Sequence, residues 1–247
     1  MDGSTPRHQI TRLRHELRRR VVTLASAERL TPHMLRLVFT SPELRDFVSA
    51  GPDDHVKLFF DGEMRDYTPR RFDPEAGTLT LDFAIHEAGP ATAWAMAARP
   101  GDSLQIAGPR GSAVVPDDFD WYLLIGDETA LPAIGRRIEE LRPGVSVTSF
   151  VLVPEMDDAQ HLATAANWTG HWIARGASTD DAGLLLAAMR GFASPPGEGF
   201  VWIAAEATAA RALRRHVVET LGHPKAWVKA AGYWLRGVAD AHERIED

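Results

Sequence analysis

The texture of the sequence changes near Pro116, and this change constrains the fold more than any other feature of the chain. Before it, short apolar runs are separated by turns rich in glycine and proline. After it, apolar runs alternate with segments long enough to form helices. The first pattern is typical of an antiparallel barrel or sandwich, and the second of a parallel sheet covered by helices. We therefore expect two domains, at residues 20–116 and 117–247, preceded by a basic arm at residues 1–19.

The first domain is expected to consist mainly of strands. Its clearest runs are residues 21–27, 34–40, 56–60 and 79–86. In the last run, apolar residues occupy every second position from Leu79 to Ile85, and this period of two gives a strand one apolar face. Asp82 and His86 then share the other face. Residues 91–99 are the helical candidate of this half.

The second domain is expected to alternate strands with helices. The expected strands are residues 121–125, 145–153, 171–174, 200–204 and 226–234. The expected helices are a segment ending at Leu141 and residues 184–192 and 208–221. In open sheets of this kind, ligands bind beyond the carboxyl ends of the strands.

Composition limits the chemistry that the chain can perform. The 247 residues include no cysteine, which excludes disulfides, thiolate metal sites, iron–sulfur clusters and cysteine nucleophiles. Any redox chemistry therefore needs a bound cofactor. The ten histidines form no HExxH pair, and no GxSxG is present, so neither a built-in metal centre nor a serine hydrolase is supported.

Charge is distributed unevenly along the chain. Residues 1–20 contain six arginines and two acidic residues, whereas the whole chain carries a net charge of −7. The segment has no interleaved aromatic residues and only a narrow apolar face, so we favour a solvated arm over a contact with nucleic acid or anionic lipid. No apolar run reaches the ~20 residues of a membrane span, and there is no signal peptide. We expect a cytoplasmic protein that does not bind nucleic acid.

Residues 65–71, RDYTPRR, are a candidate ligand site. In an extended segment Arg65 and Tyr67 project to one face and Thr68 to the other. An arginine beside an aromatic ring suits a ligand with a flat ring and a phosphate, because the guanidinium binds phosphate through two hydrogen bonds while the ring stacks. The alternative is an edge strand protected by charged residues.

Two loops that open helices are further candidates. His86 precedes residues 89–94, where amides at a helix N-terminus and the Thr92 hydroxyl suit a phosphate; a capped helix without a ligand is the alternative. Residues 126–132, GDETALP, follow an apolar strand but match neither GxGxxG nor a P-loop. Asp127 and Glu128 would repel phosphate there, so they cap the helix or contact a ribose hydroxyl.

Five segments in the same order carry a family resemblance: RDYTPR, LDFAIHEAGPATAWA, PGDSLQIAGPRGS, GDETALPAI and GYWLRG. Together they resemble the siderophore-interacting protein family of flavin-dependent ferric-siderophore reductases, over nearly all of residues 20–240. The resemblance implies an antiparallel six-stranded FAD-binding β-barrel followed by a parallel-sheet α/β domain that binds NADH or NADPH, as in ferredoxin-NADP reductases. It also implies reduction of ferric iron in a siderophore, so that the metal leaves as ferrous iron.

The resemblance implies roles for individual residues. Arg65 would hold the FAD pyrophosphate, Tyr67 would pack on the isoalloxazine or ribityl chain, and Thr68 would hydrogen-bond near flavin N5. Other implied FAD contacts are Asp82, Phe83 and His86, which would line the flavin, and Ala91, Thr92 and Ala93, which would offer backbone donors near Trp94. The implied nicotinamide floor is Gly126, Asp127, Glu128 and Thr129, with Glu206 further along the sheet; Ala205 stands where the family often has glycine before that acid.

No side chain is assigned as a certain catalytic residue, since the flavin carries electrons singly from a hydride donor to ferric iron. An anionic ferric siderophore needs a local basic patch on this acidic chain, and the candidates are Lys229, Arg236, Arg70 and Arg71; for Lys229 and Arg236 solvated edge charges are the alternative. Two rival functions stay open: a flavin oxidoreductase that passes electrons to a partner protein, and a non-catalytic siderophore or flavin carrier. Ferredoxin is an alternative electron donor.

Overall fold

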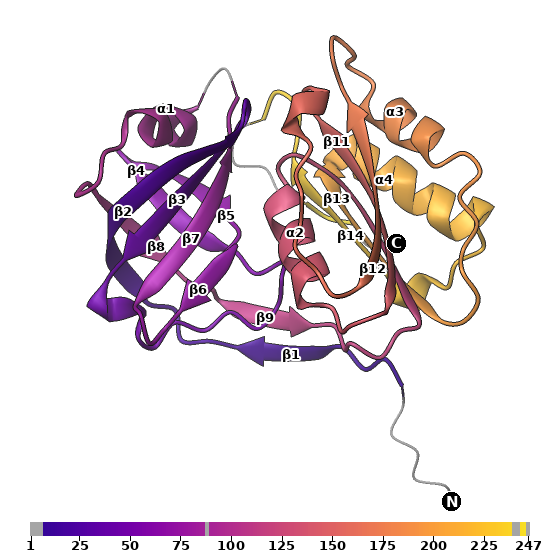
Figure 1. The fold of residues 1–247 in the computed structure, drawn as a ribbon, viewed down its shortest axis with the longest axis horizontal. Coiled ribbons are helices and arrows are strands. Elements are labelled where there is room, and N and C mark those ends of the chain that lie inside the picture. The colour runs from indigo at the N-terminus through magenta and orange to yellow at the C-terminus, as the bar shows by residue number, and fades with distance from the viewer. Residues whose placement is uncertain (1–6, 87–88, 239–242, 246–247) are drawn as a thin grey trace, which may run out of the picture.

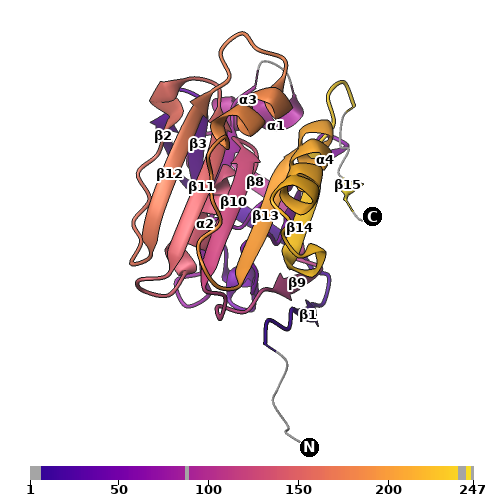
Figure 2. The ribbon, with the colours of Figure 1, turned by 90° about the vertical axis from the view of Figure 1, so that its right-hand side faces the viewer.

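The computed structural model describes residues 7–86, 89–238 and 243–245, which form two lobes side by side (Figure 1). One lobe is a curled antiparallel sheet, and the other is a mostly parallel sheet with helices on both faces (Figure 2). The two expected architectures are therefore confirmed. Among the described residues, no helix is long and apolar enough to cross a membrane.

The sheet of the first lobe has the strand order β5-β4-β8-β2-β3-β7-β6. In chain order its strands are β2 (Arg19–Thr31), β3 (Met34–Thr40), β4 (Val56–Phe60), β5 (Glu63–Tyr67), β6 (Arg71–Asp73), β7 (Thr78–Ala84) and β8 (Ser103–Ala107). The resemblance implied a barrel of six strands, whereas the structure has an open, curled sheet of seven strands. The two edge strands, β5 and β6, are consecutive in the chain, so Thr68, Pro69 and Arg70 pass from one edge of the sheet to the other.

The core of the first lobe follows from the alternation in its strands. Leu37 and Phe39 of β3 and Leu81 and Phe83 of β7 are fully buried, and they share one apolar cluster. Helix α1 (Pro90–Ala97) adds Ala91 and Ala95 to the same cluster. A short 3-10 turn, η1 (Pro42–Leu44), contributes Leu44.

The sheet of the second lobe has the order β12-β11-β10-β13-β14-β15. Its strands are β10 (Trp121–Asp127), β11 (Ser146–Val153), β12 (Asn167–Ala174), β13 (Gly199–Glu206), β14 (Val228–Trp234) and the short antiparallel edge strand β15 (Glu243–Arg244). Its helices are α2 (Leu131–Glu140), α3 (Asp181–Ala188) and α4 (Ala207–Arg215), and its shorter turns are η2 (Met156–Asp158), η3 (His216–Thr220) and η4 (Lys225–Trp227).

Strand β10 explains why this sheet is covered on both faces. Tyr122 and Leu124 belong to the cluster under α2, whereas Leu123 and Ile125 belong to the cluster under α3 and α4. Every residue of β10 is buried. A strand without a polar face needs helices on both sides, and this is the pattern of parallel α/β sheets.

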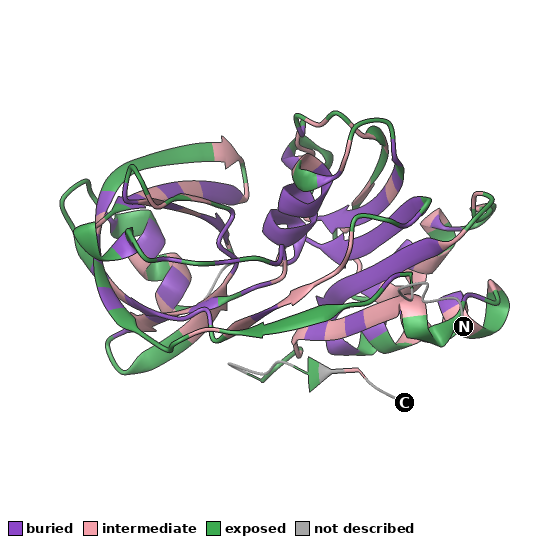
Figure 3. Ribbon diagram, turned by 90° about the horizontal axis from the view of Figure 1, so that it is seen from below, coloured by how far each residue is buried: buried purple, intermediate pink, exposed green. Residues whose placement is uncertain are grey.

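Residues 7–19 of the segment predicted as a solvated arm are part of the fold, and its residues 1–6 lie outside the described residues. Strand β1 (Thr11–Arg14) pairs antiparallel with β9 (Gly111–Val114), and this two-stranded ribbon runs beneath both lobes (Figure 1). A Cβ at Gly111 would lie 2.4 Å from the Leu13 carbonyl oxygen, so glycine permits the close pairing. Figure 3 shows β1 exposed along its length beside the buried strands of the second lobe.

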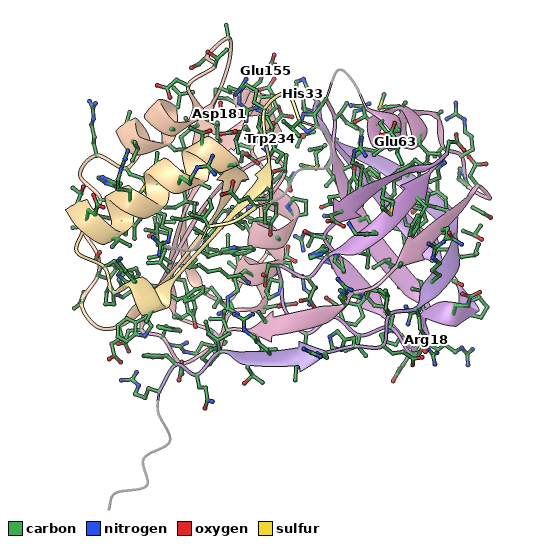
Figure 4. The ribbon with its side chains drawn as sticks, turned by 180° about the vertical axis from the view of Figure 1, so that it is seen from behind. Arg18, His33, Glu63, Glu155, Asp181 and Trp234 are labelled. Atoms are coloured by element: carbon green, nitrogen blue, oxygen red, sulfur yellow. The ribbon has the colours of Figure 1, made fainter. Side chains whose placement is uncertain are left out.

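Helix α2 joins the lobes through a buried arginine. Arg136 is 5% exposed, and its guanidinium donates to the Ser49 hydroxyl at 2.7 Å, the Ser49 carbonyl at 2.9 Å and the Pro69 carbonyl at 2.9 Å. At another point of contact, His33 in the turn between β2 and β3 pairs with Asp158 of η2 at 2.8 Å. Figure 4 shows His33 close to Glu155, which precedes η2.

Candidate active site between the lobes

A cavity of about 1080 Å³ lies where the lobes and the β1–β9 ribbon meet. This volume is at the upper end of the range for small-molecule and cofactor sites, about 300–1000 Å³. The walls contain polar, charged and aromatic side chains from both lobes. The lining residues used below are Arg12, Arg14, His15, Asp53, Asp54, His55, Arg65, Tyr67, Thr68, Asp82, His86, Ala91, Thr92, Arg110, Ser112, Thr129, Lys229, Tyr233 and Trp234.

The end of β5 supplies one wall of the cavity. Arg65, Tyr67 and Thr68 all line it, as expected from the sequence. The Tyr67 ring lies 4.2 Å from the Phe83 ring, and burial raises the pKa of the Tyr67 hydroxyl well above its ordinary value. Arg65 forms an ion pair with Glu63 at 2.6 Å while remaining partly exposed. A cation, a fixed aromatic ring and a hydroxyl are therefore presented together.

Strand β7 has some side chains on the cavity wall and others in the apolar core. Asp82 lines the cavity, but its carboxylate accepts two hydrogen bonds of 2.7 Å from Arg36. Phe83 is fully buried in the core and is absent from the cavity lining, so its predicted place along the flavin is not supported by the lining and stays a prediction. The alternation of the strand is the reason, because successive side chains point to opposite faces.

The N-terminus of α1 opens onto the cavity. Ala91 and Thr92 line it, and Gly89 caps the helix without any side-chain hydrogen bond. The Ala93 amide already donates to the Gly89 carbonyl at 3.0 Å, and Trp94 packs against Phe39 and Phe60 in the core. The Ala93 amide and the Trp94 ring thus have partners within the protein, and their ligand roles stay predictions. The first turn of the helix has no side-chain acceptor from its N-cap residue.

His86 lies on the cavity wall as expected. Burial lowers the pKa of its ring, with smaller contributions from neighbouring charges. At neutral pH His86 is therefore an uncharged ring beside the first turn of α1, a suitable surface for a flat ligand.

The acidic residues at the end of β10, Asp127 and Glu128, are buried and are not in the cavity lining. Asp127 accepts hydrogen bonds from Thr129, from the Glu206 amide at 3.0 Å and from the Trp234 indole at 2.8 Å. Burial, and then the Glu128 charge, raise the pKa of Asp127 to about 6. Of the predicted nicotinamide floor, Thr129 alone lines the cavity.

Three predicted nicotinamide residues have structural roles. Glu128 forms a bidentate ion pair with Arg175, with both oxygen–nitrogen distances 2.7 Å. Glu206 caps α4 by accepting from the amides of the first turn. At Gly126 a Cβ would lie 2.5 Å from the Ala204 carbonyl oxygen, so glycine serves the close approach of β10 and β13. Gly126, Asp127, Glu128 and Glu206 thus have structural partners, and their contacts with the nicotinamide stay predictions.

Of the four cations predicted to bind substrate, Lys229 alone lines the cavity, and it pairs with Asp53. Arg236 is not in the lining; it pairs with Asp181 at 3.5 Å, and its guanidinium lies 5.5 Å from the ring centre of the cavity-lining Trp234. Figure 4 shows Asp181 and Trp234 near the same end of the second lobe. Arg70 is 2% exposed and forms a bidentate pair with Glu139 of α2.

Arg71 pairs with the same Glu139 carboxylate at 3.0 Å. Arg70 and Arg71 therefore belong to the contact with α2, because Pro69 directs the chain across the opening of the sheet towards that helix. Of the predicted four-residue basic patch, Lys229 is the one member on the cavity wall, and the substrate contacts of the other three stay predictions.

The cavity is also lined by cations that were not predicted from the sequence as site residues. Arg12 and Arg14 of β1 and Arg110 beside β9 line it, and none makes an ion pair within the described residues. The charges of Arg12 and Arg14 were visible in the sequence of the arm. The pairing that brings β1 under the lobes was not, because a four-residue exposed strand has no apolar period.

Two further aromatic residues were missed, on the opposite wall. Tyr233 and Trp234 at the end of β14 line the cavity, facing it from the second lobe while Tyr67 faces it from the first. Trp234 is fixed by its hydrogen bond to Asp127. Rings on opposing walls, a partly exposed arginine and an uncapped helix start fit a flat ring joined to phosphates, and FAD has this chemistry. In the described residues no cluster of metal-binding side chains is present.

Comparisons with known proteins agree with this arrangement. A sequence model described as the siderophore-interacting FAD-binding domain matches residues 23–63 and 61–113, and one described as siderophore-interacting protein matches residues 119–237. An NADPH-dependent ferric-chelate reductase from Escherichia coli K12 is 36% identical, with 94% of this chain and 98% of that protein covered.

Solved structures show the same similarity. A siderophore utilization protein from T. fusca is 36% identical at a TM-score of 0.86, over 94% of this chain and 98% of that one. The siderophore-interacting protein SipS from Aeromonas hydrophila is 30% identical at a TM-score of 0.78, over 92% and 94%. Ferredoxin reductases at 10–16% identity share the fold alone.

Proposed function

This chain belongs to the siderophore-interacting protein family, and from this premise we propose that it reduces ferric iron in siderophore complexes with electrons from NADPH, through bound FAD. The observation that carries the proposal is the cavity between the lobes, where Arg65, Tyr67 and Thr68 face Tyr233 and Trp234. The similarity to a relative named NADPH-dependent ferric-chelate reductase supports the choice of donor and acceptor.

The side chains of the first lobe would hold the cofactor. Arg65 would pair with the pyrophosphate, the first turn of α1 with Thr92 would donate to a phosphate oxygen, and Tyr67 would pack against the ring system. Thr68 is buried and fixed by the chain crossing between β5 and β6, so its hydroxyl can hydrogen-bond the ring edge. When bound, FAD takes a hydride from NADPH and passes electrons singly to iron.

The cavity contains charge suited to an anionic iron complex. Arg12, Arg14 and Arg110 line it without an ion pair in the described part of the chain, and Lys229 lies on the same lining. We propose that these cations attract the ferric complex to the ring in place of the predicted Arg70, Arg71 and Arg236. Positive charge in a concave site raises the local concentration of an anion even when the whole protein is acidic.

We propose the cytoplasm as the compartment, since NADPH and FAD are supplied there. The proposed task of the protein is positioning: the walls hold the donor and acceptor at one ring, and no protein acid or base is needed for electron transfer itself. A ferredoxin as donor, or a partner protein as acceptor, would use the same cofactor wall.

The test begins with the spectrum of the purified protein. We expect a flavin spectrum with one FAD per chain, anaerobic bleaching by NADPH, and recovery of the oxidised spectrum on addition of a ferric catecholate complex, with ferrous iron captured by a colorimetric chelator. A protein that takes up no FAD would refute the proposal. Bleaching by reduced ferredoxin but not by NADPH would change the donor, and bleaching without transfer to any ferric complex would favour a protein acceptor.

A further inference from the structure

His15 is attached to a buried carboxylate at one side of the cavity. It follows β1, and its backbone amide donates to the Arg110 carbonyl at 3.0 Å, which fixes the residue beside β9. Its ring lines the cavity, and Nε2 lies 2.8 Å from the hydroxyl of Ser112. The Ser112 hydroxyl lies 2.6 Å from Oδ2 of Asp54, which is 3% exposed.

The direction of these hydrogen bonds assigns the proton on the ring. An ionised carboxylate only accepts hydrogen bonds, so the Ser112 hydroxyl donates its one hydrogen bond to Asp54. The Ser112 oxygen then accepts, from the Ala50 amide at 3.1 Å and from His15. Nε2 of His15 must therefore carry a proton in either charge state. Nδ1 makes no hydrogen bond within the described residues, so it is left available to a ligand in the cavity.

The Asp54 end of this chain is fully anchored. Its Oδ2 also accepts from the Ser49 hydroxyl at 2.9 Å and the Gly51 amide at 3.1 Å. Ser49 is in turn held by Arg136. The whole chain of donors points towards one buried negative charge, which balances a positive charge on the His15 ring through Ser112.

Two other histidines line the cavity, but neither is arranged in this way. His86 is uncharged at neutral pH because burial lowers its pKa, and its Nδ1 is 4.0 Å from the Glu128 carboxylate. His55 is exposed and its ring makes no hydrogen bond within the described part of the chain. Among the described histidines of the cavity, His15 alone has one ring nitrogen fixed and the other available.

We propose that His15 is a general acid that protonates a donor oxygen of the ferric complex as the iron is reduced. This proposal rests on the proposed function. One electron from reduced FAD converts ferric to ferrous iron; an iron–oxygen bond breaks, its electron pair stays on the oxygen, and the proton on Nδ1 moves to that oxygen. His15 is left neutral with its proton on Nε2, and solvent supplies the next proton at Nδ1.

The charged and titratable groups around His15 set the conditions for this transfer. Glu16 is adjacent to His15 in the chain. The charged and titratable groups that share the cavity lining with His15 are Arg12, Arg14, Asp53, Asp54, His55, Arg65, Asp66, Tyr67, Asp82, His86, Arg110, Lys229, Tyr233 and Glu243. The cations hold an anionic complex close to the ring. A protonated oxygen binds ferrous iron weakly, so proton delivery at this place speeds release of the metal.

The variant His15→Gln tests the role, because glutamine retains a donor for Ser112 but carries no titratable proton. With ferric 2,3-dihydroxybenzoate as acceptor and a ferrous chelator as trap, we expect turnover to fall about 100-fold, at the lower end of what general acids contribute. Ferricyanide accepts an electron without releasing its ligands, so its reduction and the bleaching by NADPH should stay at the wild-type rate. His161→Gln, exposed and outside the cavity, is the matched control.

A structural measurement checks the proton assignment without turnover. Long-range proton–nitrogen NMR correlations should show neutral His15 protonated at Nε2 in the wild type and a mixture of tautomers in Ser112→Ala. A ring protonated at Nδ1 would overturn the proposal. So would equal catecholate rates in wild type and His15→Gln, in which case the proposed function stands. A wild type that bleaches with NADPH but reduces no ferric complex would overturn the proposed function and the role of His15 together.

Discussion

Asp127 shows how residue type and burial separate a structural acid from a ligand. Its carboxylate is buried and receives hydrogen bonds from Thr129, the Glu206 amide and Trp234. Burial and the adjacent Glu128 raise its pKa to about 6, although the hydrogen bonds from Thr129 and Trp234 act in the opposite direction. Asp127 therefore holds the cavity-lining indole in place and changes charge close to neutral pH.

This titration should be visible in the fluorescence of Trp234. Ionisation of Asp127 places a negative charge beside the indole N–H, so the difference in emission between wild type and Trp234→Phe should change with pH with a midpoint near 6. Asp127→Asn should abolish the transition. A midpoint below pH 5 in the wild type would show that the hydrogen bonds outweigh burial.

Arg65 carries a second prediction at the scale of a single residue. Its removal takes away a charge-assisted contact with phosphate of roughly 1.5–3 kcal/mol, which corresponds to a loss of about 10- to 100-fold in FAD affinity for Arg65→Ala. Fluorescence titration of the flavin-free protein with FAD measures the change. Arg71→Ala, which removes an arginine that pairs with Glu139 outside the cavity, should retain wild-type affinity. Equal affinities in all three proteins would show that Arg65 does not hold the phosphate.

Among the elements, the N-terminal segment is attached to the second lobe by a buried histidine. The His8 ring stacks on Phe119 with centroids 3.8 Å apart, and its nitrogens lie 2.7 Å from Asp118 and 2.9 Å from Glu198. Both acceptors are carboxylates, so both nitrogens must carry protons. Burial alone would lower the pKa of His8, but the two hydrogen bonds outweigh it and raise the pKa above 6.5.

The sign of this shift predicts how the segment responds to pH. A histidine whose pKa is raised by folding adds stability that is complete below about pH 6.5 and is lost as the pH rises through the raised value. Because Asp118 and Glu198 are partly exposed, we expect about 1 kcal/mol. Thermal unfolding should show His8→Gln destabilised more at pH 6 than at pH 9, whereas His161→Gln should show no such difference. If the difference in melting temperature between wild type and His8→Gln were larger at pH 9 than at pH 6, the raised pKa of His8 would be contradicted.

The elements also show what sequence patterns can predict. The apolar run of β10 and the alternation in β7 are dictated by the core, so both strands were placed correctly and both lobes followed from them. Strand β6 has three residues and β1 has four, each too short to show a period, and both depend on a partner distant in the chain.

The contrast between local patterns and partners distant in the chain also applies to the candidate site. Arg65, Tyr67 and Thr68 all line the cavity because a local motif places them together. The ion pairs of Arg70 and Arg236 were not predicted because their partners, Glu139 and Asp181, come from other elements. Ion pairs between distant segments leave no local pattern, and they decide which cations remain available to a ligand.

At the scale of the whole molecule, the geometry of the cavity depends on how α2 holds the lobes together. Arg136 reaches from α2 into the first lobe and donates to Ser49 and Pro69, next to the chain crossing that carries Thr68. Arg70 reaches in the opposite direction to Glu139. Because both arginines are buried, their bonds fix the distance between the wall of the first lobe and that of the second.

Arg136→Met should therefore weaken the contact between the two lobes more than it destabilises the fold of either lobe. Methionine fills most of the volume but leaves the Ser49 hydroxyl, the Ser49 carbonyl and the Pro69 carbonyl without their donor, which costs roughly 2–4 kcal/mol in the free energy of unfolding.

Unfolding in guanidinium tests this prediction. In the wild type we expect the unfolding curves recorded by flavin fluorescence and by far-ultraviolet circular dichroism to coincide, as for one cooperative unit. In Arg136→Met, flavin release should precede the loss of secondary structure, since the cavity opens before the lobes unfold. Arg215→Met, an exposed arginine of α4, should leave the two curves together. Coincident curves for Arg136→Met, shifted or not, would show that other contacts such as His33 with Asp158 are sufficient to hold the lobes in register.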